Sequence, residues 1–380
     1  MFEIFPEKYV WNLSANIALS SGGEIEEILE ACRPLAEAQE RGEEPGTEDF
    51  FDSWQAVADR QVELANENIG EGRELSAATR LRRAAIYYQI SERMQSRWFT
   101  PREGAYKKML DAFADSVRLG RDNCEIVEVP YGDSMIPALF VRAEGVDGPA
   151  PVMVHCNGLD SSKEMIYWSG IGQELARRGI STLMVDQPGT GGALRLQGLT
   201  AIHDSERWAS ACVDYLEGRD DVDAKRVGMM GWSLGGYFAP RAAAFEKRFS
   251  LCVAWGANYN WGELQKRRLN REGDRPVPHY WDHVLWVWGY ENVDEFMEFA
   301  PKMTLEGVVE RITVPFLVTH GQNDRQIPLE YAQAQYDHAV NSPKRELKIF
   351  TPREGGVEHV SADNQPVATN FISDWVSENI

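Results

Sequence analysis

Ser233 stands in a short glycine-rich segment with the composition of a strand-to-helix turn. The segment reads Gly-Trp-Ser-Leu-Gly-Gly over 231–236 and fits the pattern G-x-S-x-G. It directly follows the apolar run RVGMM and directly precedes a run with helical spacing. Glycines beside the serine relieve backbone crowding in such a turn, so the hydroxyl projects above the edge of a sheet. The pattern therefore predicts that Ser233 is a nucleophile.

A serine hydroxyl needs a base to take its proton, and a third group must orient that base. His359 is the candidate base because it lies in the loop GGVEHVSADN, after the last apolar strand pattern and before the final helical run. The other histidines precede the serine, lie in an insertion, close a strand or fall in a helical run: His155, His203, His279, His283, His320 and His338.

The acid is expected in the turn that follows the apolar run PFLVTHG, and Asp324 is the carboxylate there. Asp337 and Asp363 are weaker choices because they fall in or at the start of predicted helices. The order serine, acid, histidine along the chain is the order that this kind of site requires. The sequence therefore predicts a triad of Ser233, Asp324 and His359.

Acyl transfer also needs hydrogen-bond donors for the oxyanion of a tetrahedral intermediate. One backbone amide is expected from Leu234, the residue after the nucleophile. The other is expected from the loop after PVMVHCNG, where Leu159 is the preferred donor and Gly158 is its neighbour.

Strand and helix patterns alternate from residue 124 to the end of the chain. Short apolar runs such as PVMVHCNG, ISTLMVDQPG and LCVAWGA are separated by amphipathic segments, including a helix-length one over 163–179. Such alternation predicts a doubly wound, mostly parallel α/β sheet. With the serine motif, it predicts an α/β-hydrolase fold with a catalytic domain over 124–380.

The N-terminal region 1–123 has a different pattern. Three segments, 23–42, 47–69 and 74–95, carry apolar residues at three- and four-residue spacing and are expected to be amphipathic helices. The chain is therefore predicted to have a helical N-terminal region followed by the catalytic domain.

An insertion at about 260–308 interrupts the alternation between two predicted core strands. It is helical in pattern and rich in aromatic residues, and we expect it to form a cap over the active site. Trp281, Trp286 and Trp288 are candidate pocket residues; the alternative is that they only pack the insertion onto the core.

The composition argues against several classes of partner. The chain has 59 Asp and Glu residues and only 39 Lys and Arg residues. The resulting net charge of −20 repels nucleic acid and anionic membranes. No run of apolar residues reaches the length of a membrane span, no basic and apolar leader opens the chain, and no metal cluster or phosphate-binding loop is readable. We therefore expect a cytoplasmic enzyme that acts on a small molecule without a cofactor.

The triad and four longer segments resemble the 2,6-dihydroxypseudooxynicotine hydrolase family. The segments are NGLDSSKE (157–164), DQPGTGG (186–192), GWSLGGYFAPRAAAFEKRF (231–249) and CVAWGA (252–257). Relatives include fungal hydrolases that shorten naphthopyrone polyketides, and the similarity reaches the fermentation-respiration switch proteins. The resemblance covers the whole chain.

This resemblance implies hydrolysis of a carbon–carbon bond next to a ketone, by a retro-Claisen route, in an aromatic or polyketide-like compound. It also implies a homodimer, and it draws attention to Glu263 as an additional acid, although an exposed helix-start glutamate is the simpler interpretation. A carboxylester or lactone hydrolase is the first alternative, because the same triad serves those bonds. A regulatory binding protein that keeps the fold without turnover is the second.

Overall fold

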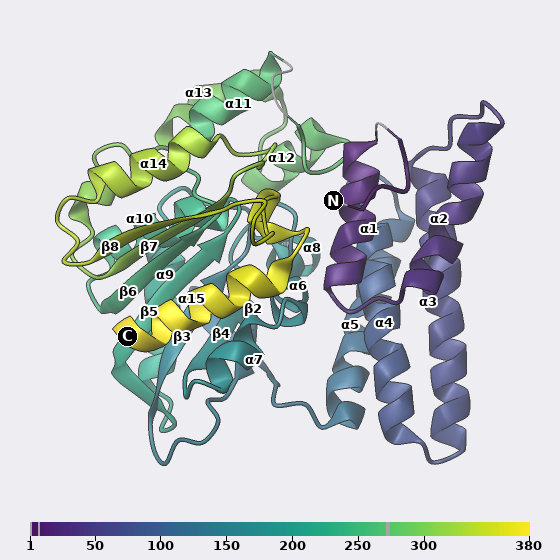
Figure 1. Ribbon diagram of the computed structural model, residues 1–380, viewed down its shortest axis with the longest axis horizontal. Helices are drawn as coiled ribbons and strands as arrows, with labels where there is room; N and C mark the ends of the chain where they lie inside the picture. Colours follow the sequence, from purple (N-terminus) through teal and green to yellow (C-terminus); the bar gives the residue numbers. More distant parts are fainter. Residues whose placement is uncertain (1, 7, 271–273) are drawn as a thin grey trace. The chain divides into compact units, whose positions relative to one another are not determined.

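The computed structural model describes residues 2–6, 8–270 and 274–380, and the chain divides into two compact units. The helical unit comprises Met1–Cys124 and Arg275–His283. The hydrolase unit comprises Glu125–Asp274 and Val284–Ile380. Figure 1 shows the helices of the first unit in purple and blue and the sheet of the second in teal and green.

Five long helices build the helical unit: α1 (Tyr9–Ser20), α2 (Ile25–Glu40), α3 (Thr47–Gly70), α4 (Glu74–Arg93) and α5 (Pro101–Gly120). Helix α3 begins with a carboxylate cap, since Asp49 accepts a 2.7 Å hydrogen bond from the Gly46 amide. The aromatic rings of Trp54 and Tyr87, 5.7 Å apart, join α3 to α4 in the core. The three helices predicted from periodicity are α2, α3 and α4.

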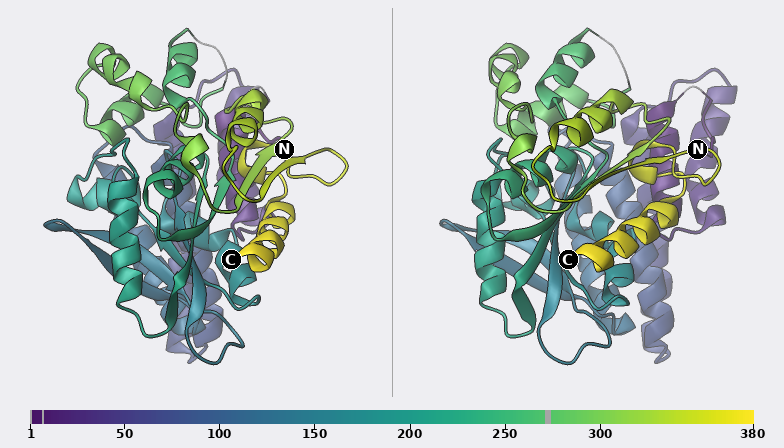
Figure 2. Two further views of the ribbon diagram at one scale, coloured as in Figure 1. Left: turned by 90° about the vertical axis from the view of Figure 1, so that its left-hand side faces the viewer. Right: turned by 60° about the vertical axis from the view of Figure 1, so that its left-hand side comes forward.

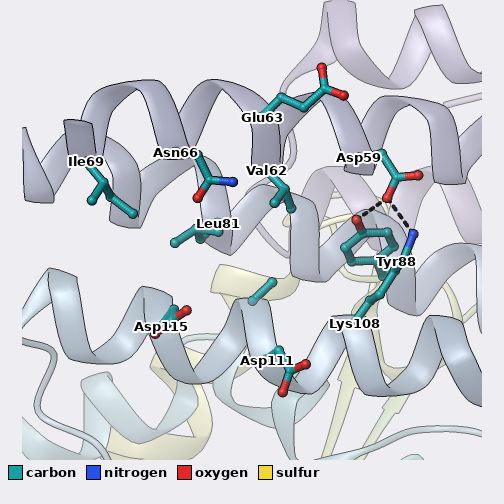
Figure 3. Close-up of a pocket in the computed structure, with 11 residues that line it drawn as sticks. Asp59, Val62, Glu63, Asn66, Ile69, Leu81, Tyr88, Lys108, Asp111 and Asp115 are labelled. Carbon is teal, nitrogen blue, oxygen red and sulfur yellow. Dashed lines mark hydrogen bonds and ion pairs between the residues drawn. The ribbon is translucent and has the colours of Figure 1, made fainter. Parts of the chain in front are cut away.

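Helices α3, α4 and α5 enclose a groove of about 470 Å³ (Figure 3). At one point the carboxylate of Asp59 accepts hydrogen bonds from the Tyr88 hydroxyl and from Lys108, the latter at 2.7 Å. The lining side chains are mostly acidic or apolar: Asp59, Val62, Glu63, Asn66, Ile69, Leu81, Tyr88, Lys108, Asp111, Ala112 and Asp115. Four carboxylates against one ammonium leave the groove acidic.

The hydrolase unit is built on an eight-stranded sheet in the order β1-β2-β4-β3-β5-β6-β7-β8. The strands are β1 (Glu125–Tyr131), β2 (Ser134–Val141), β3 (Ala150–Cys156), β4 (Ser181–Val185), β5 (Val222–Trp232), β6 (Phe249–Trp255), β7 (Phe316–Gly321) and β8 (Arg345–Phe350). Strand β2 pairs antiparallel with β1 and β4, and the other pairs are parallel. Parallel strands present their carboxyl ends at one edge, where ligand sites of α/β sheets form.

Helices cover both faces of this sheet. They are α6 (Lys163–Trp168), α7 (Ile171–Ala176), α8 (Gly191–Gln197), α9 (Glu206–Glu217), α10 (Gly235–Phe245), α14 (Leu329–His338) and α15 (Gln365–Asn379), with a 3₁₀ turn η3 (His359–Ser361) before α15. Helices α9 and α10 pack together on one face, while α15 lies with α7 on the other (Figures 1 and 2). The architecture is the predicted α/β-hydrolase fold, in which the strands β3, β4, β6 and β7 are buried along nearly their whole length.

Two segments differ in detail from the sequence-based expectation. The segment 163–179 is not one helix, because Gly170 adopts a φ of 81° and separates α6 from α7. The insertion contains α11 (Trp261–Leu269), α12 (Tyr280–Trp288), α13 (Val293–Phe299) and the 3₁₀ turns η1 (Ala300–Lys302) and η2 (Val309–Arg311). Its residues 271–273 lie outside the described residues, and its segment 275–283 belongs to the helical unit.

Candidate active site

Ser233 occupies a strained turn between β5 and α10. Its φ is 58°, in the left-handed region that residues with a side chain seldom adopt, and its amide donates a 2.8 Å hydrogen bond to the Trp255 carbonyl. Glycine is required beside it, since a Cβ at Gly231 would lie 2.4 Å from the Gly235 carbonyl oxygen. This sharp turn places the Ser233 hydroxyl at the carboxyl edge of the sheet.

Ser233, His359 and Asp324 form one hydrogen-bonded row. The Ser233 Oγ lies 2.8 Å from His359 Nε2, and His359 Nδ1 lies 2.7 Å from Asp324 Oδ2. His359 comes from η3, and Asp324 comes from the turn after β7. With a proton on Nδ1, the imidazole donates to the carboxylate and accepts from the serine hydroxyl. This arrangement can move the serine proton to the ring.

Asp324 is held as a buried carboxylate, 1% exposed. Its Oδ1 accepts hydrogen bonds from the amides of Gln326 and Ile327, at 2.8 and 3.0 Å. Burial alone would raise the pKa of Asp324, but the charge and hydrogen bond of His359 outweigh burial and hold that pKa below its usual value. The carboxylate therefore stays ionised at neutral pH and can stabilise an imidazolium.

His320 supports the turn that carries Asp324. Its Nε2–H donates a 3.1 Å hydrogen bond to the Ile327 carbonyl and lies 3.7 Å from Asp324 Oδ2. Burial lowers the pKa of His320, so the ring is neutral. Sequence reasoning passed over this histidine as the end of a strand; its spacing of four residues before Asp324 was the available signal.

The candidate oxyanion donors lie on two segments beside Ser233. Leu234 is the N-cap residue of α10, where an amide has no preceding helical turn to bond. A Cβ at Gly158 would lie 2.8 Å from Ser233 Cβ, so only glycine permits this approach. The Gly158 amide itself donates to Ser161 Oγ at 3.0 Å, and the next residue, Leu159, is buried.

Glu263 lies on the first turn of α11 and is 45% exposed. Its carboxylate pairs with Arg267 at 2.8 Å, one helical turn later, and accepts a 3.1 Å hydrogen bond from the Tyr331 hydroxyl. These contacts satisfy the carboxylate within the insertion and its neighbour α14.

The three candidate tryptophans have different surroundings. Trp288 is 4% exposed and packs against Trp261, with ring centroids 5.6 Å apart, as well as against aromatic rings of α10 and α13. Trp286 is half-buried, and the Arg195 guanidinium lies 5.6 Å from its ring centroid. Trp281 belongs to the helical unit and contacts Tyr280.

Comparison with known proteins defines the family. Residues 53–261 match the family described as Esterase FrsA-like, and residues 173–380 match the Prolyl oligopeptidase family. Each match covers more than half of the chain. The chain belongs to these α/β-hydrolase families. As a member of them, it is an α/β-fold serine hydrolase.

Individual relatives extend this similarity over most of the hydrolase. The chain is similar to 2,6-dihydropseudooxynicotine hydrolase of Paenarthrobacter nicotinovorans, with 25% identity over 309 residues, 80% of this chain and 78% of the relative. It is also similar to hydrolase acrC of Aspergillus aculeatus, with 27% identity over 77% of this chain and 81% of the relative. The crystal structure of 2,6-dihydroxy-pseudo-oxynicotine hydrolase matches its fold with a TM-score of 0.76 and 21% identity, covering 96% and 95% of the two chains.

Two further findings concern the described residues of this hydrolase. No three or more of their His, Cys, Asp and Glu side chains are grouped so that they could hold a metal ion. In the same part of the chain, no helix combines the length and the apolar character needed to cross a bilayer.

Proposed function

We propose that this hydrolase cleaves a carbon–carbon bond next to a ketone in an aromatic or polyketide-like small molecule, through an acyl-enzyme on Ser233. The assignment of Ser233 as the nucleophile rests on the hydrogen bonds that connect Ser233 to His359 and His359 to Asp324. The bond type rests on the similarity to 2,6-dihydropseudooxynicotine hydrolase over four fifths of the chain.

In the first half of the reaction, Ser233 Oγ attacks the ketone carbon while His359 Nε2 takes the hydroxyl proton. The Asp324 carboxylate stabilises the imidazolium that results. Negative charge develops on the former carbonyl oxygen, where the amides of Leu234 and Leu159 are the proposed donors.

Collapse of the tetrahedral intermediate breaks the bond between the carbonyl carbon and its neighbour. The electron pair leaves on carbon, stabilised as an enol or an electron-rich arene, and that carbon receives a proton from the His359 imidazolium or from water. Water, deprotonated by His359, then attacks the acyl-enzyme and releases a carboxylic acid and free Ser233. The net reaction adds one water across the broken bond.

An ester or lactone hydrolase is the second candidate, and the match of residues 53–261 to the Esterase FrsA-like family favours it. The same nucleophile, base and oxyanion donors would serve, and only the leaving group differs: an oxygen in the ester and a carbon in the ketone. The two candidate reactions therefore differ in the atom that receives the proton, which is carbon in the ketone reaction and oxygen in the ester reaction.

A panel of β-diketones, aryl ketones, lactones and p-nitrophenyl esters, hydrolysed in deuterated water, tests the proposal. Carbon–carbon cleavage should place deuterium on carbon in the leaving fragment, and kcat/KM for the best ketone should exceed that for short esters by at least about tenfold, roughly 1.4 kcal/mol of transition-state preference.

Ser233→Ala serves as the control, since it should remove turnover by several orders of magnitude at unchanged folding. Fast ester hydrolysis with inertness toward every ketone would replace this proposal by the esterase candidate. Binding of ketones without turnover of any compound would support the regulatory alternative.

A further inference from the structure

The Ser161 hydroxyl is the centre of a buried hydrogen-bond cluster beside the nucleophile. Its side chain accepts the Gly158 amide at 3.0 Å and the Trp232 indole Nε1–H at 3.0 Å. It donates to Asn157 Oδ1 at 2.7 Å. A hydroxyl has one donor and two acceptor positions, so this residue, 7% exposed, uses its full capacity inside the protein.

The cluster joins two segments that are far apart in sequence. Ser161 and Gly158 belong to the loop 157–162 after β3, whereas Trp232 is the residue directly before the nucleophile. Gly158 also approaches Ser233 so closely that a Cβ there would overlap the serine side chain. The loop that carries the proposed second oxyanion donor therefore lies directly against the nucleophile turn.

The base of this loop is fixed to the end of β4. The Asn157 backbone exchanges two 2.9 Å hydrogen bonds with the Gln187 side chain, and the Asn157 side-chain amide donates to Asp186 at 3.1 Å. At the other end of the loop, the Lys163 amide donates to Asp186 at 2.7 Å.

These bonds tie both ends of the loop to the sheet. Between them, the middle of the loop is linked to the nucleophile turn through Ser161. A shift of the middle residues would move the Leu159 amide away from the oxyanion without disturbing the base of the loop.

We propose that Ser161 is a positioning residue that holds the oxyanion loop in register with Ser233. The inference rests on the proposed function, because it assigns this loop to the oxyanion. Stabilisation of an oxyanion depends on donors placed at about 2.7–3.1 Å before the reaction. Loss of the Ser161 hydroxyl should therefore slow bond formation at Ser233 while leaving ground-state binding nearly unchanged.

The test measures covalent labelling by an alkyl fluorophosphonate, because its phosphoryl oxygen enters the oxyanion site whatever bond the enzyme naturally cleaves. In Ser161→Ala the maximal labelling rate should fall about 10- to 100-fold, with the half-saturating concentration within about threefold of wild type. Ser161→Thr, which keeps the hydroxyl, should recover most of the rate. Ser205→Ala is the matched control, since Ser205 is also buried and its hydroxyl donates to the Phe238 carbonyl, at 2.7 Å, on α10.

Trp232→Phe provides a second, independent variant. It removes the indole donor to Ser161 and keeps an aromatic ring against His155 and Trp255. It should slow labelling about 3- to 10-fold, and adding it to Ser161→Ala should cause little further loss, because the bond is then already absent. If the double variant lost labelling rate by the product of the two single-variant factors, the proposed coupling between Ser161 and Trp232 would be wrong. A wild-type rate in Trp232→Phe would also contradict it, even if Ser161→Ala did not fold.

The same experiment separates the two proposals. Failure of the fluorophosphonate to label Ser233 in the wild-type protein would refute the proposed nucleophile. Normal labelling of Ser233 in wild type and an equal maximal rate in Ser161→Ala would refute only the role of Ser161.

Discussion

At the scale of single residues, the candidate site depends on a backbone conformation that serine seldom adopts. The hydrogen bond from the Ser233 amide to the Trp255 carbonyl helps to hold Ser233 at a φ of 58°. Gly231 and Gly236 permit the tight packing around this turn, because a Cβ at either position would clash with a backbone carbonyl oxygen. A conformation of this kind costs on the order of 1–3 kcal/mol and persists only when the surroundings impose it. The orientation of the buried Asp324 carboxylate is also fixed by its surroundings, through hydrogen bonds from two backbone amides and from the His359 ring.

Asp324→Asn should reduce turnover by about 10³- to 10⁴-fold while the protein still folds. The amide would present a donor to His359 Nδ1, so the ring would carry its proton on Nε2 and could not accept from Ser233. Steady-state kinetics and circular dichroism check this expectation.

Asp337→Asn is the matched control, because Asp337 is exposed on α14 and bonds the Gln333 side chain. Its kcat should equal that of wild type. Retention of most activity in Asp324→Asn would instead assign the orienting role to another acid.

At the scale of elements, the aromatic insertion contains residues with two kinds of role. Trp288 on α12 is enclosed by rings from α10, α11 and α13, which makes it part of the packing of the insertion onto the core. Trp286 is two residues before Trp288, so it lies on nearly the opposite face of α12. It is half-buried and lies against Arg195 of α8, the helix that follows β4 at the carboxyl edge of the sheet. We propose that Trp286 rather than Trp288 contacts the substrate.

Alanine substitutions at these two positions should therefore differ. Trp288→Ala should lower the free energy of unfolding by about 3–5 kcal/mol, because it leaves a cavity among aromatic side chains. Trp286→Ala should cost less than about 1.5 kcal/mol but raise KM or alter selectivity across the ketone panel. Thermal melts and substrate profiles measure both effects. Equal destabilisation by both variants with unchanged kinetics would make the two tryptophans packing residues.

At the scale of the whole molecule, folding stability should depend on pH through a buried histidine that is not part of the proposed triad. His155 on β3 is fully buried between Trp232 and Trp255, and both ring nitrogens are without hydrogen-bond partners among the described residues. Burial lowers its pKa to about 3, against 6.5 for an exposed histidine. Below pH 6.5 the unfolded chain therefore binds a proton that the folded chain excludes, and folding stability falls as the pH falls toward 3.

His155→Phe should remove this contribution. The free energy of unfolding of the variant, relative to wild type, should increase by about 2 kcal/mol between pH 7 and pH 5. Urea denaturation of both proteins at several pH values measures this difference. A difference between His155→Phe and wild type that stays constant over this range would mean that the pKa of His155 is the same in the folded and unfolded states.

Much of the fold could be predicted from the sequence because its signals are local. Apolar runs and helical spacing indicated the strands β3 to β8 and the helices α2 to α4, and the glycines around Ser233 indicated a sharp turn. Chain order and loop position were enough to single out Asp324 and His359, which the structure brings within hydrogen-bond distance of each other. These features depend on residues close together in the chain or on a fixed order of elements.

Tertiary structure alone decided the contacts between segments that are distant in sequence. Ser161 and Trp232 are 71 residues apart, and no periodicity links a loop hydroxyl to an indole across that distance. The burial of Trp288, the position of His320 beside Asp324, and the use of the Gly158 amide by Ser161 likewise depend on how strands and helices pack. A residue type and its neighbours define what a side chain can bond, but the partner that it bonds is selected only when the folded sheet brings the two together.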